Sequence, residues 1–343
     1  MSNIEQNRIK VSLPLVAVYS FILFLLNIGI SNSQSDAGGY SSSYLLRNIG
    51  ARSIGMAGAY TAVANEPGGI YYNPAGLGYL NDYPIFNSTV SVLGLGRVQS
   101  SIAWGQEVAP YFGLGASFNS FYGGSFTARD IRGNPIGEMS DFQYALAMGA
   151  SYRIEFMSMG AAVKYLYSSL NSSPLSAGGV ALDVGTKFDV FDLFSFGLSV
   201  QNISGMMFWN NELDTREDIP YTIRAGIAIE FGLNDETYTT RSTVTGEKEE
   251  IIIPATRYVL LASDIVYTQY QTSPELIIGI EASLHELIAL RGGLSVYGDK
   301  FGEPQLFPMN HWGGGISLRP DLKDLPFKMN LDYSMSNEYI TSN

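Results

Sequence analysis

The sequence predicts an all-β protein, an antiparallel transmembrane β-barrel with a short helical or irregular N-terminal hatch in its lumen. Apolar and polar residues alternate with a period of two from residue 83 onward. The alternating segments are about ten residues long, whereas strands in soluble sheets usually have five or six. A tilted strand crosses a bilayer with about 9–11 residues. Aromatic residues recur near the segment ends, where the girdles of membrane barrels lie.

The stretch "YTIRAGIAIEF" illustrates the alternation. Ile223, Ile227 and Ile229 fall on one face of an extended chain, whereas Arg224 and Glu230 fall on the other. A soluble antiparallel sandwich alternates in the same way and is the alternative reading. The polar faces here are small and mixed, with Gly, Ser and Ala between single charges. Such faces favour a narrow lumen over an open water-facing surface.

Thirteen strands can be counted, and the parity of bacterial single-chain barrels leads us to expect fourteen. The sequence therefore predicts that a closing strand is missing. The thirteen segments lie near 84–94, 97–106, 111–121, 142–153, 156–168, 177–189, 194–203, 219–232, 256–268, 275–284, 287–298, 311–319 and 326–336.

Short and long connections alternate between these segments, as they do in barrels that enter from the periplasm. Long outer loops are expected at 122–141, 204–218 and 299–310. The connection 233–255 should be a short turn and is too long for one. Either the flanking strands extend beyond the membrane as a hairpin, or the strand count is off by one there.

The N-terminus has the layout of a cleavable signal peptide over residues 1–33. Arg8 and Lys10 precede an apolar run at 13–30, and Ser31 and Ser33 are the small residues before a cut at Gln34. The run is also long enough to suggest an uncleaved membrane anchor. Export with cleavage predicts a hatch at 34–82, a barrel at 83–343 and location in a bacterial outer membrane, in contact with its lipid.

Composition excludes several function classes. The formal net charge is −12, which leaves no basic face to neutralise nucleic-acid phosphates. The chain has no cysteine and two histidines, so neither a thiolate metal site nor a His-rich one is expected. No nucleophile elbow, P-loop or Ser/His/Asp constellation is present. The sequence therefore predicts a protein that is not an enzyme and has no metal or cofactor.

Residues 40–80 contain the most specific motif. The stretch "GARSIGMAGAYTAVANEPGGIYYNPAGL" resembles the N-terminal signature of FadL-type outer-membrane transporters, and within that superfamily it is most similar to the PorV/PorQ family associated with type IX secretion. Weaker similarity continues through "LLASDIVY", "IIGIEASLHELIALRGGLSVYGD" and "MNLDYSMS". The resemblance implies a fourteen-stranded barrel whose N-terminal segment folds inward as a plug.

The resemblance places Asn73, Pro74, Ala75 and the following Gly76 within that plug. Asn73 is suited to cap a short helix, and Pro74 loses no needed hydrogen bond in its first turn. The stretch is either a purely structural plug or one that also contacts a ligand.

Charged residues on the polar faces of the predicted strands form a candidate lumen cluster. Burial in a narrow barrel requires such charges to be paired. They form either an ion-pair lattice that anchors the hatch, or a polar binding site or gate. The cluster comprises Lys164, Asp183, Arg224, Asp264, Glu281 and Arg291.

Two functions follow from this sequence. The PorV/PorQ resemblance implies a plugged barrel that acts in type IX protein secretion as a docking component, with secreted cargo proteins as partners at the outer loops. The alternative is a FadL-like transporter that admits hydrophobic small molecules across the outer membrane by rearranging its hatch. Only the transporter predicts an apolar pocket beside the hatch.

Overall fold

The architecture comes from a computed structural model that describes residues 41–171, 175–190, 193–211, 215–233, 236–241, 248–253, 256–271, 273–297, 309–320 and 328–337. The predicted signal peptide at 1–33 lies outside these residues. No helix in the described part of the chain has the length and apolar character needed to cross a membrane.

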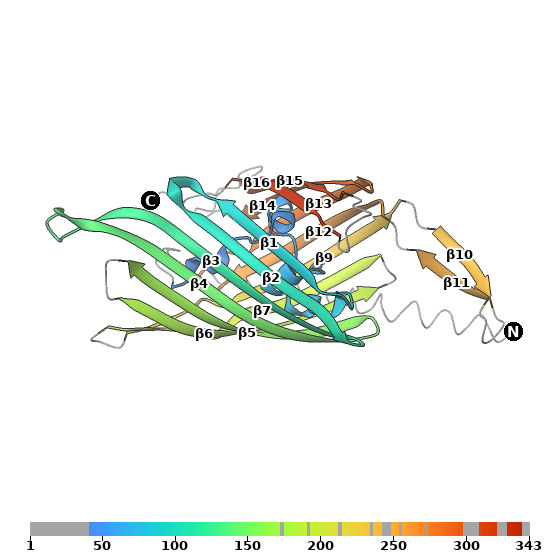
Figure 1. Ribbon diagram of the computed structural model, residues 1–343, viewed down its shortest axis with the longest axis horizontal. Coiled ribbons are helices and arrows are strands. Elements are labelled where there is room, and N and C mark those ends of the chain that lie inside the picture. Colours follow the sequence, from blue (N-terminus) through green and yellow to red (C-terminus); the bar gives the residue numbers. More distant parts are fainter. Residues whose placement is uncertain are drawn as a thin grey trace.

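One antiparallel sheet of fourteen strands curls around the molecule (Figure 1), and thirteen of its strands form a continuous path. The path contains β1 (Ile85–Val92), β2 (Val98–Ala109), β3 (Phe112–Arg129), β4 (Pro135–Ile154), β5 (Met157–Asn171), β6 (Ser176–Val190), β7 (Phe194–Trp209), β9 (Thr222–Gly232), β12 (Tyr258–Thr268), β13 (Glu275–His285), β14 (Ile288–Tyr297), β15 (Met309–Leu318) and β16 (Leu331–Ser336).

The thirteen strands of this path match the thirteen predicted segments in number and order. The fourteenth strand of the sheet, β8 (Arg216–Asp218), pairs with β7 and lies off the path. The long connection at 233–255 contains a separate two-stranded sheet, β10 (Glu236–Arg241) paired with β11 (Lys248–Ile253). The strand count is therefore correct at this point, and the hairpin is additional to the flanking strands.

The prediction of a long loop at 122–141 is wrong. β3 and β4 continue as a paired hairpin to a short turn, in which Asp130 accepts hydrogen bonds from the backbone N–H groups of Arg132 and Asn134. Polar residues and glycine break the apolar alternation in this stretch, although the backbone pairing continues. The hairpin extends from the end of the barrel shown on the left in Figure 1, which we call the hairpin end.

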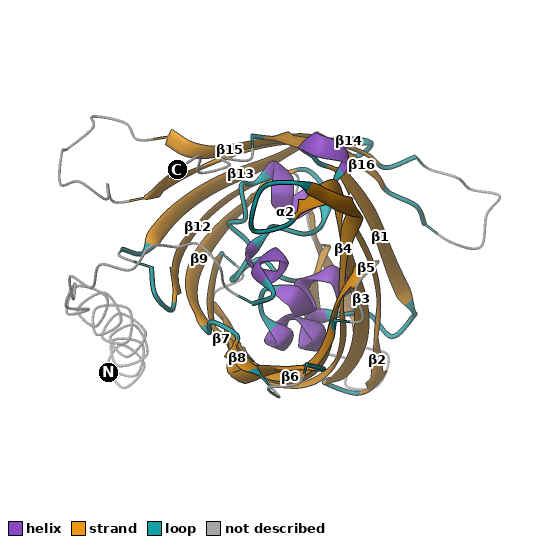
Figure 2. Ribbon diagram, turned by 90° about the vertical axis from the view of Figure 1, so that its left-hand side faces the viewer, coloured by secondary structure: helices purple, strands orange, loops and turns teal. Residues whose placement is uncertain are grey.

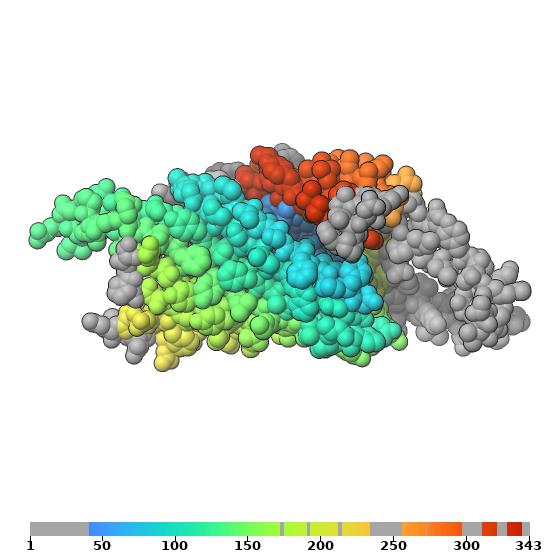
Figure 3. Space-filling view, viewed as in Figure 1, coloured from blue at the N-terminus to red at the C-terminus, as the bar shows by residue number. Residues whose placement is uncertain are grey.

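The path is not closed in the described residues, because β1 and β16 are its two ends. Every pairing between them is antiparallel, so these two edge strands run in the same direction. Figure 3 shows blue atoms of the N-terminal segment between the cyan surface of the first strands and the red surface of the last. The resemblance implies a fourteenth strand on the path, but no such strand occurs in the described part of the chain.

The two faces of the sheet differ in the way the alternation predicts. Apolar side chains on the outer face remain open, with exposed fractions of 56% for Val163, 48% for Ile278 and 70% for Phe86. Charged and polar side chains on the inner face are buried, Asp264 at 1% and Glu281 at 0%. An apolar exterior around a polar interior is the arrangement of a transmembrane barrel.

The N-terminal segment fills the lumen, where Figure 2 shows its short helices inside the ring of strands. We call described residues 41–82 the hatch. Its interior is apolar, since Met56, Tyr60 and Tyr72 are at most 1% exposed. Its helices are η1 (Ser43–Leu46), α2 (Ala51–Gly55), η2 (Pro67–Tyr71) and η3 (Pro74–Tyr79).

Inward-facing glycines let the sheet approach the hatch backbone closely. A Cβ built on Gly313 would lie 2.0 Å from the carbonyl oxygen of Ile54, and one on Gly113 would lie 2.0 Å from that of Leu77. Ten strands each contribute at least one glycine whose Cβ would lie within 3.1 Å of a hatch atom. This glycine belt comprises Gly105, Gly113, Gly149, Gly160, Gly185, Gly197, Gly226, Gly279, Gly293 and Gly313.

Two glycine-containing stretches of the sequence, "GLG" and "GGG", have different roles. The run Gly313–Gly315 lies in β15, where Gly313 and Gly315 face the hatch, as close packing requires. The run Gly94–Gly96 does not lie in a strand. It forms the 3-10 turn η4 between β1 and β2, with Leu95 and Gly96 both at positive φ.

Candidate functional site

Asn73 is the polar centre of the hatch motif and is fully buried. Its side-chain oxygen accepts a hydrogen bond from the Ala75 N–H at 3.1 Å, with Pro74 in the first turn of η3. Its amide nitrogen donates to the carbonyl oxygens of Thr61 and Thr186, both at 3.0 Å. Asn73 therefore caps η3 as predicted and also joins two hatch segments to strand β6.

Small residues allow this motif to lie against the wall. A Cβ on Gly76 would lie 2.3 Å from the Ala64 carbonyl oxygen, and one on Gly185 would lie 2.1 Å from the Asn73 side-chain oxygen. Ser158 of β5 donates to the Ala75 carbonyl at 2.8 Å. Asn73, Pro74 and Ala75 therefore contact strands β5 and β6, whereas Gly76 packs against Ala64 within the hatch.

Asp264 on β12 holds the opposite side of the hatch. Its Oδ2 accepts hydrogen bonds from the backbone N–H groups of Tyr60 at 3.0 Å and Thr61 at 2.9 Å, and from the Thr61 hydroxyl at 2.6 Å. Arg224 of β9 pairs with the same oxygen at 3.2 Å and donates to the Gly58 carbonyl at 2.7 Å. One buried ion pair thus binds the backbone of residues 58–61.

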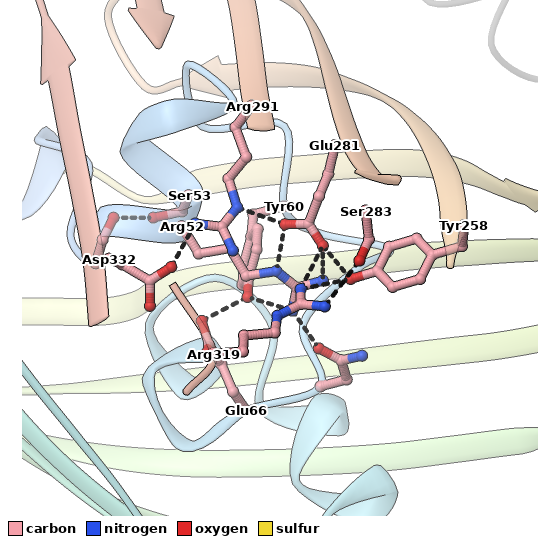
Figure 4. A network of polar contacts seen from close by, with 12 residues as sticks. Arg52, Ser53, Tyr60, Glu66, Tyr258, Glu281, Ser283, Arg291, Arg319 and Asp332 are labelled. Carbon is pink, nitrogen blue, oxygen red and sulfur yellow. Dashed lines mark hydrogen bonds and ion pairs between the residues drawn. The ribbon is translucent and has the colours of Figure 1, made fainter. Parts of the chain in front are cut away.

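Glu281 on β13 is the centre of a second network (Figure 4). Arg52 of α2 binds both of its oxygens, through Nε at 2.8 Å and Nη2 at 3.0 Å. Arg291 of β14 donates to Oε2 at 2.5 Å and also pairs with Asp332 of β16. The Tyr258 hydroxyl donates to Oε1. A charge-assisted bidentate pair of this kind is strong and fixes orientation, so Glu281 holds α2 against the wall.

Tyr60 connects these two networks through the hatch. Its backbone N–H bonds Asp264, and its hydroxyl accepts a hydrogen bond from Arg52 and donates one to Glu66. Burial raises the pKa of Tyr60, with Arg52 opposing and Glu66 adding to the rise, so the phenol keeps its proton. Burial acts to lower the pKa of Arg52, but Glu281, Tyr60 and Tyr258 together more than offset this effect, so the pKa is raised and Arg52 stays charged.

Lys164 and Asp183 form a third pair, on β5 and β6, at 2.8 Å. β7 carries extra residues opposite this pair, and Asn202 and Ser204 have φ angles of 58° and 50°. The Asn202 N–H donates to Asp183 at 2.8 Å, and Lys164 donates to the Asn202 side-chain oxygen. The Asp183 carboxylate therefore accepts a backbone hydrogen bond from β7 at the point where the regular pairing of β6 with β7 is interrupted.

The structure places all six predicted lumen residues on the inner face, but in three groups rather than one cluster. Two of the groups bind the hatch, and the third supports an irregular strand. No group of metal-ligating side chains occurs in the part of the chain that the structure describes. The arrangement can hold a plug by charge and hydrogen bonding, and its described residues form no reactive constellation.

Several partners were missed by the sequence reasoning. Arg52, Tyr60 and Tyr258 have no period-two signal because two of them lie in the hatch and Tyr258 begins a strand. One signal was available for Arg52. It is a single charge among small and apolar residues in a segment expected to lie inside the barrel, so it needs a buried carboxylate partner.

The described surface contains an apolar groove of about 510 Å³ on the outer face of strands β3 to β7. Its lining includes the outward side chains Met159, Val184 and Leu198. It lies behind the wall that contacts η3, because Gly160 and Gly185 form part of both. The groove faces the lipid side and is not the lumen pocket that a transporter predicts.

No protein-family model matches this sequence, and no curated protein is similar to it. Solved structures share its fold. The Pseudomonas putida toluene transporter TodX is 13% identical with a TM-score of 0.53, covering 83% of this chain and 91% of its own. A Pseudomonas aeruginosa FadL homologue is 11% identical with a TM-score of 0.51, covering 83% of this chain and 88% of its own.

These matches confirm the FadL-like barrel fold that the sequence predicts. They do not extend to the PorV/PorQ family, and that closer relation stays a prediction from the sequence.

Proposed function

We propose that this protein is an outer-membrane barrel that admits hydrophobic small molecules, and that its hatch controls their passage. The likeness to a toluene transporter over most of both chains is the observation that carries the proposal. The open apolar exterior and the plugged polar lumen support it, because this exterior suits lipid and the lumen suits a controlled path.

The hatch contacts suggest how passage is controlled. The segment 52–61 is held by Asp264 and Glu281, and Asn73 is held by β6. These bonds are non-covalent, so a local rearrangement can break some of them while others keep the hatch in the barrel. A solute then binds at the hairpin end and leaves toward the periplasm or sideways once the hatch moves.

The cargo-docking role predicted from the PorV/PorQ resemblance has weaker support. Its expected contact surface included loops at 122–141, 204–218 and 299–310. The first is largely a regular hairpin, and much of the third lies outside the described residues. No contact described here favours a protein partner. The transporter, the alternative reading of the sequence, is therefore the function that we propose.

Uptake by intact Gram-negative cells tests the proposal, because their outer membrane is the barrier that slows apolar solutes. Cells that express the full chain should take up radiolabelled propylbenzene several times faster than vector-only cells. Uptake of a polar sugar should not change. Equal propylbenzene rates would contradict the proposal, and equal acceleration of both solutes would indicate an open pore instead. Recovery of exported proteins with the purified barrel, without faster uptake, would favour cargo docking.

A further inference from the structure

Strands β3 to β7 form one side of the barrel (Figure 1), and the apolar groove of about 510 Å³ lies on their outer face. We call it the outer groove. Ala150 of β4 lies opposite Ala161 of β5, and both alanines follow belt glycines that face the hatch, Gly149 and Gly160. Successive side chains of a strand point to opposite faces, so the two alanines point outward. They form the floor of the outer groove.

Two rows of larger side chains border this floor. On one side Tyr152 lies opposite Met159, and on the other side Met148 lies opposite Val163. All four side chains are open, with exposed fractions between 51% and 61%. Successive rows on one face are about 7 Å apart, because each row is two residues further along the strand. The two rims are therefore about 13 Å apart at the level of the backbone, with only the alanines between them.

The chemistry of the lining limits what can occupy the groove. No charged side chain occurs among its described lining residues. Of its two serines, Ser199 donates its hydroxyl to the Tyr72 carbonyl at 2.7 Å, and Ser151 lies beside Gly78, so both point to the hatch. The groove is continuous with the apolar outer face, which suits lipid. Its occupant is therefore expected to be a hydrocarbon chain.

The length of the groove fits one such chain. The lining extends from Phe112 of β3 to Leu198 and Val200 of β7. Neighbouring strands are about 4.8 Å apart, so five strands span about 19 Å. The hydrocarbon core of a bilayer is about 30 Å thick, so one leaflet contributes about 15 Å. A single acyl chain can therefore lie along the groove within one leaflet.

The rim at Tyr152 indicates which end of the chain is polar. The row of Tyr152 and Met159 continues to Thr186, so this rim carries two hydroxyl groups. It lies toward the end of the barrel opposite the hairpin end, where Tyr111 and Phe156 are exposed. Exposed aromatic residues of this kind form the girdle at the lipid head groups. The head group of a bound lipid therefore belongs on the Tyr152 side.

We propose that the outer groove binds one acyl chain of a phospholipid, with the head group on the Tyr152 side. Behind the floor, a Cβ on Gly160 would lie 2.5 Å from the Pro74 carbonyl oxygen, so only backbone separates the groove from the hatch. The bound chain packs on the outer face of the wall that holds Asn73. The inference rests on the membrane location in the proposed function, but it does not require passage of a solute.

Photolabelling of the full chain in lipid nanodiscs tests this inference. The probe is a phosphatidylcholine with a diazirine in its acyl chain, and mass spectrometry of peptides locates the adducts. Adducts on the groove residues of β4 and β5 should exceed those on the comparably open outer face of β13 by roughly twofold to fivefold, the effect of a few additional van der Waals contacts. A phosphatidylglycerol probe should give the same ratio, because the lining has no charge. Equal labelling of both faces, or enrichment with the anionic probe alone, would overturn the inference.

Three variants locate the effect. Ala161→Phe should remove the enrichment, because its ring fills the floor, and the smaller change Ala150→Leu should reduce it. Ser263→Phe is the control, since it adds a ring to the outer face of β12, next to the inward-facing Asp264, and should leave the ratio unchanged. The gel shift between folded and heated forms shows that each variant is folded. Enrichment that persists in both alanine variants contradicts the site.

A second copy of the chain is the other candidate occupant, and one further variant tests for it. The chain has no cysteine, so Ala161→Cys introduces a single thiol in the groove. This variant should stay monomeric when it is oxidised in nanodiscs that contain two barrels. Efficient formation of a disulfide-linked dimer would show that a second copy covers the groove, and it would overturn the lipid site.

The two proposals fail in different ways. Propylbenzene uptake by cells together with equal labelling of the two faces leaves the transporter in place and overturns the lipid groove. Enriched labelling of the groove together with unchanged cellular uptake leaves the groove in place and overturns the transporter.

Discussion

Asp264 shows how much a single buried side chain can organise in this protein. One of its oxygens receives two backbone N–H groups, one hydroxyl and one guanidinium, and the residue is 1% exposed. The alternation in the sequence placed Asp264 on the inner face. It did not reveal that two of its partners are backbone groups, because any residue at positions 60 and 61 could supply them.

Replacing Asp264 by alanine should destabilise the barrel strongly. The change leaves Arg224 buried without its partner and two backbone N–H groups unpaired. Loss of one member of a buried ion pair typically costs about 3–5 kcal/mol. Urea unfolding of the purified chain in detergent, followed by the gel shift between folded and heated forms, measures this loss.

Asp332→Asn is the matched control for that change. Asp332 also pairs with a buried arginine, Arg291, but its side chain is 27% exposed and Arg291 keeps Glu281. Partly solvated pairs contribute little, so the loss should stay near or below about 1 kcal/mol. Equal losses for the two variants would show that Asp264 is not a special anchor.

At the level of the strands, the glycine belt determines how the wall meets the hatch. Neighbouring residues of β15 differ sharply in this respect. A Cβ on Gly313 would lie 2.0 Å from the Ile54 carbonyl oxygen, whereas the nearest atom to one on Gly314 is the Arg291 carbonyl oxygen at 4.0 Å. The strand can therefore accept a methyl group on its outer face but not on its inner face.

Gly313→Ala should displace α2 or β15 and lower the free energy of unfolding by about 1–3 kcal/mol, the usual cost of overpacking. Gly314→Ala should be nearly neutral. Proteolysis of membrane fragments, with fragments assigned to the hatch, shows whether α2 has moved. A hatch that is equally resistant in both variants would mean that the close contact at Gly313 relaxes without cost.

The strands could be predicted from the sequence because alternation is a local property of each segment. The β3–β4 hairpin was missed because its residues interrupt the alternation, whereas backbone pairing does not depend on them. The partners of Arg52 and Tyr60 could not be predicted because they lie on strands more than 200 residues away. The Asn73 cap was predictable, since the signal for a cap lies within three residues.

For the whole molecule, the main question is whether the hatch moves while the wall stays in place. The hatch is attached on two sides, by Asp264 and Glu281 on one and by Asn73 and Ser158 on the other. The chain has no cysteine, so an introduced pair forms a single defined disulfide. A Cβ on Gly78 of η3 would lie 3.3 Å from the Ser158 Cβ, close enough for such a link.

The double variant Gly78→Cys with Ser158→Cys should lose propylbenzene uptake when oxidised and regain it on reduction, if η3 moves during transport. Each single cysteine variant should transport in both conditions and serves as the control. Unchanged uptake by the oxidised double variant would show that η3 stays fixed and that only the segment near η1 moves.

The glycine belt also has an electrical consequence. Side chains ordinarily narrow the waist of a small barrel, but here ten strands contribute hydrogen atoms at that level and the hatch supplies the bulk. At the glycine belt the lumen is therefore filled by the hatch and not by side chains of those ten glycine positions. We expect a motion that carries the hatch fully out of the belt to open an ion-conducting path, and passage of a solute without such a leak then requires that the hatch move only in part.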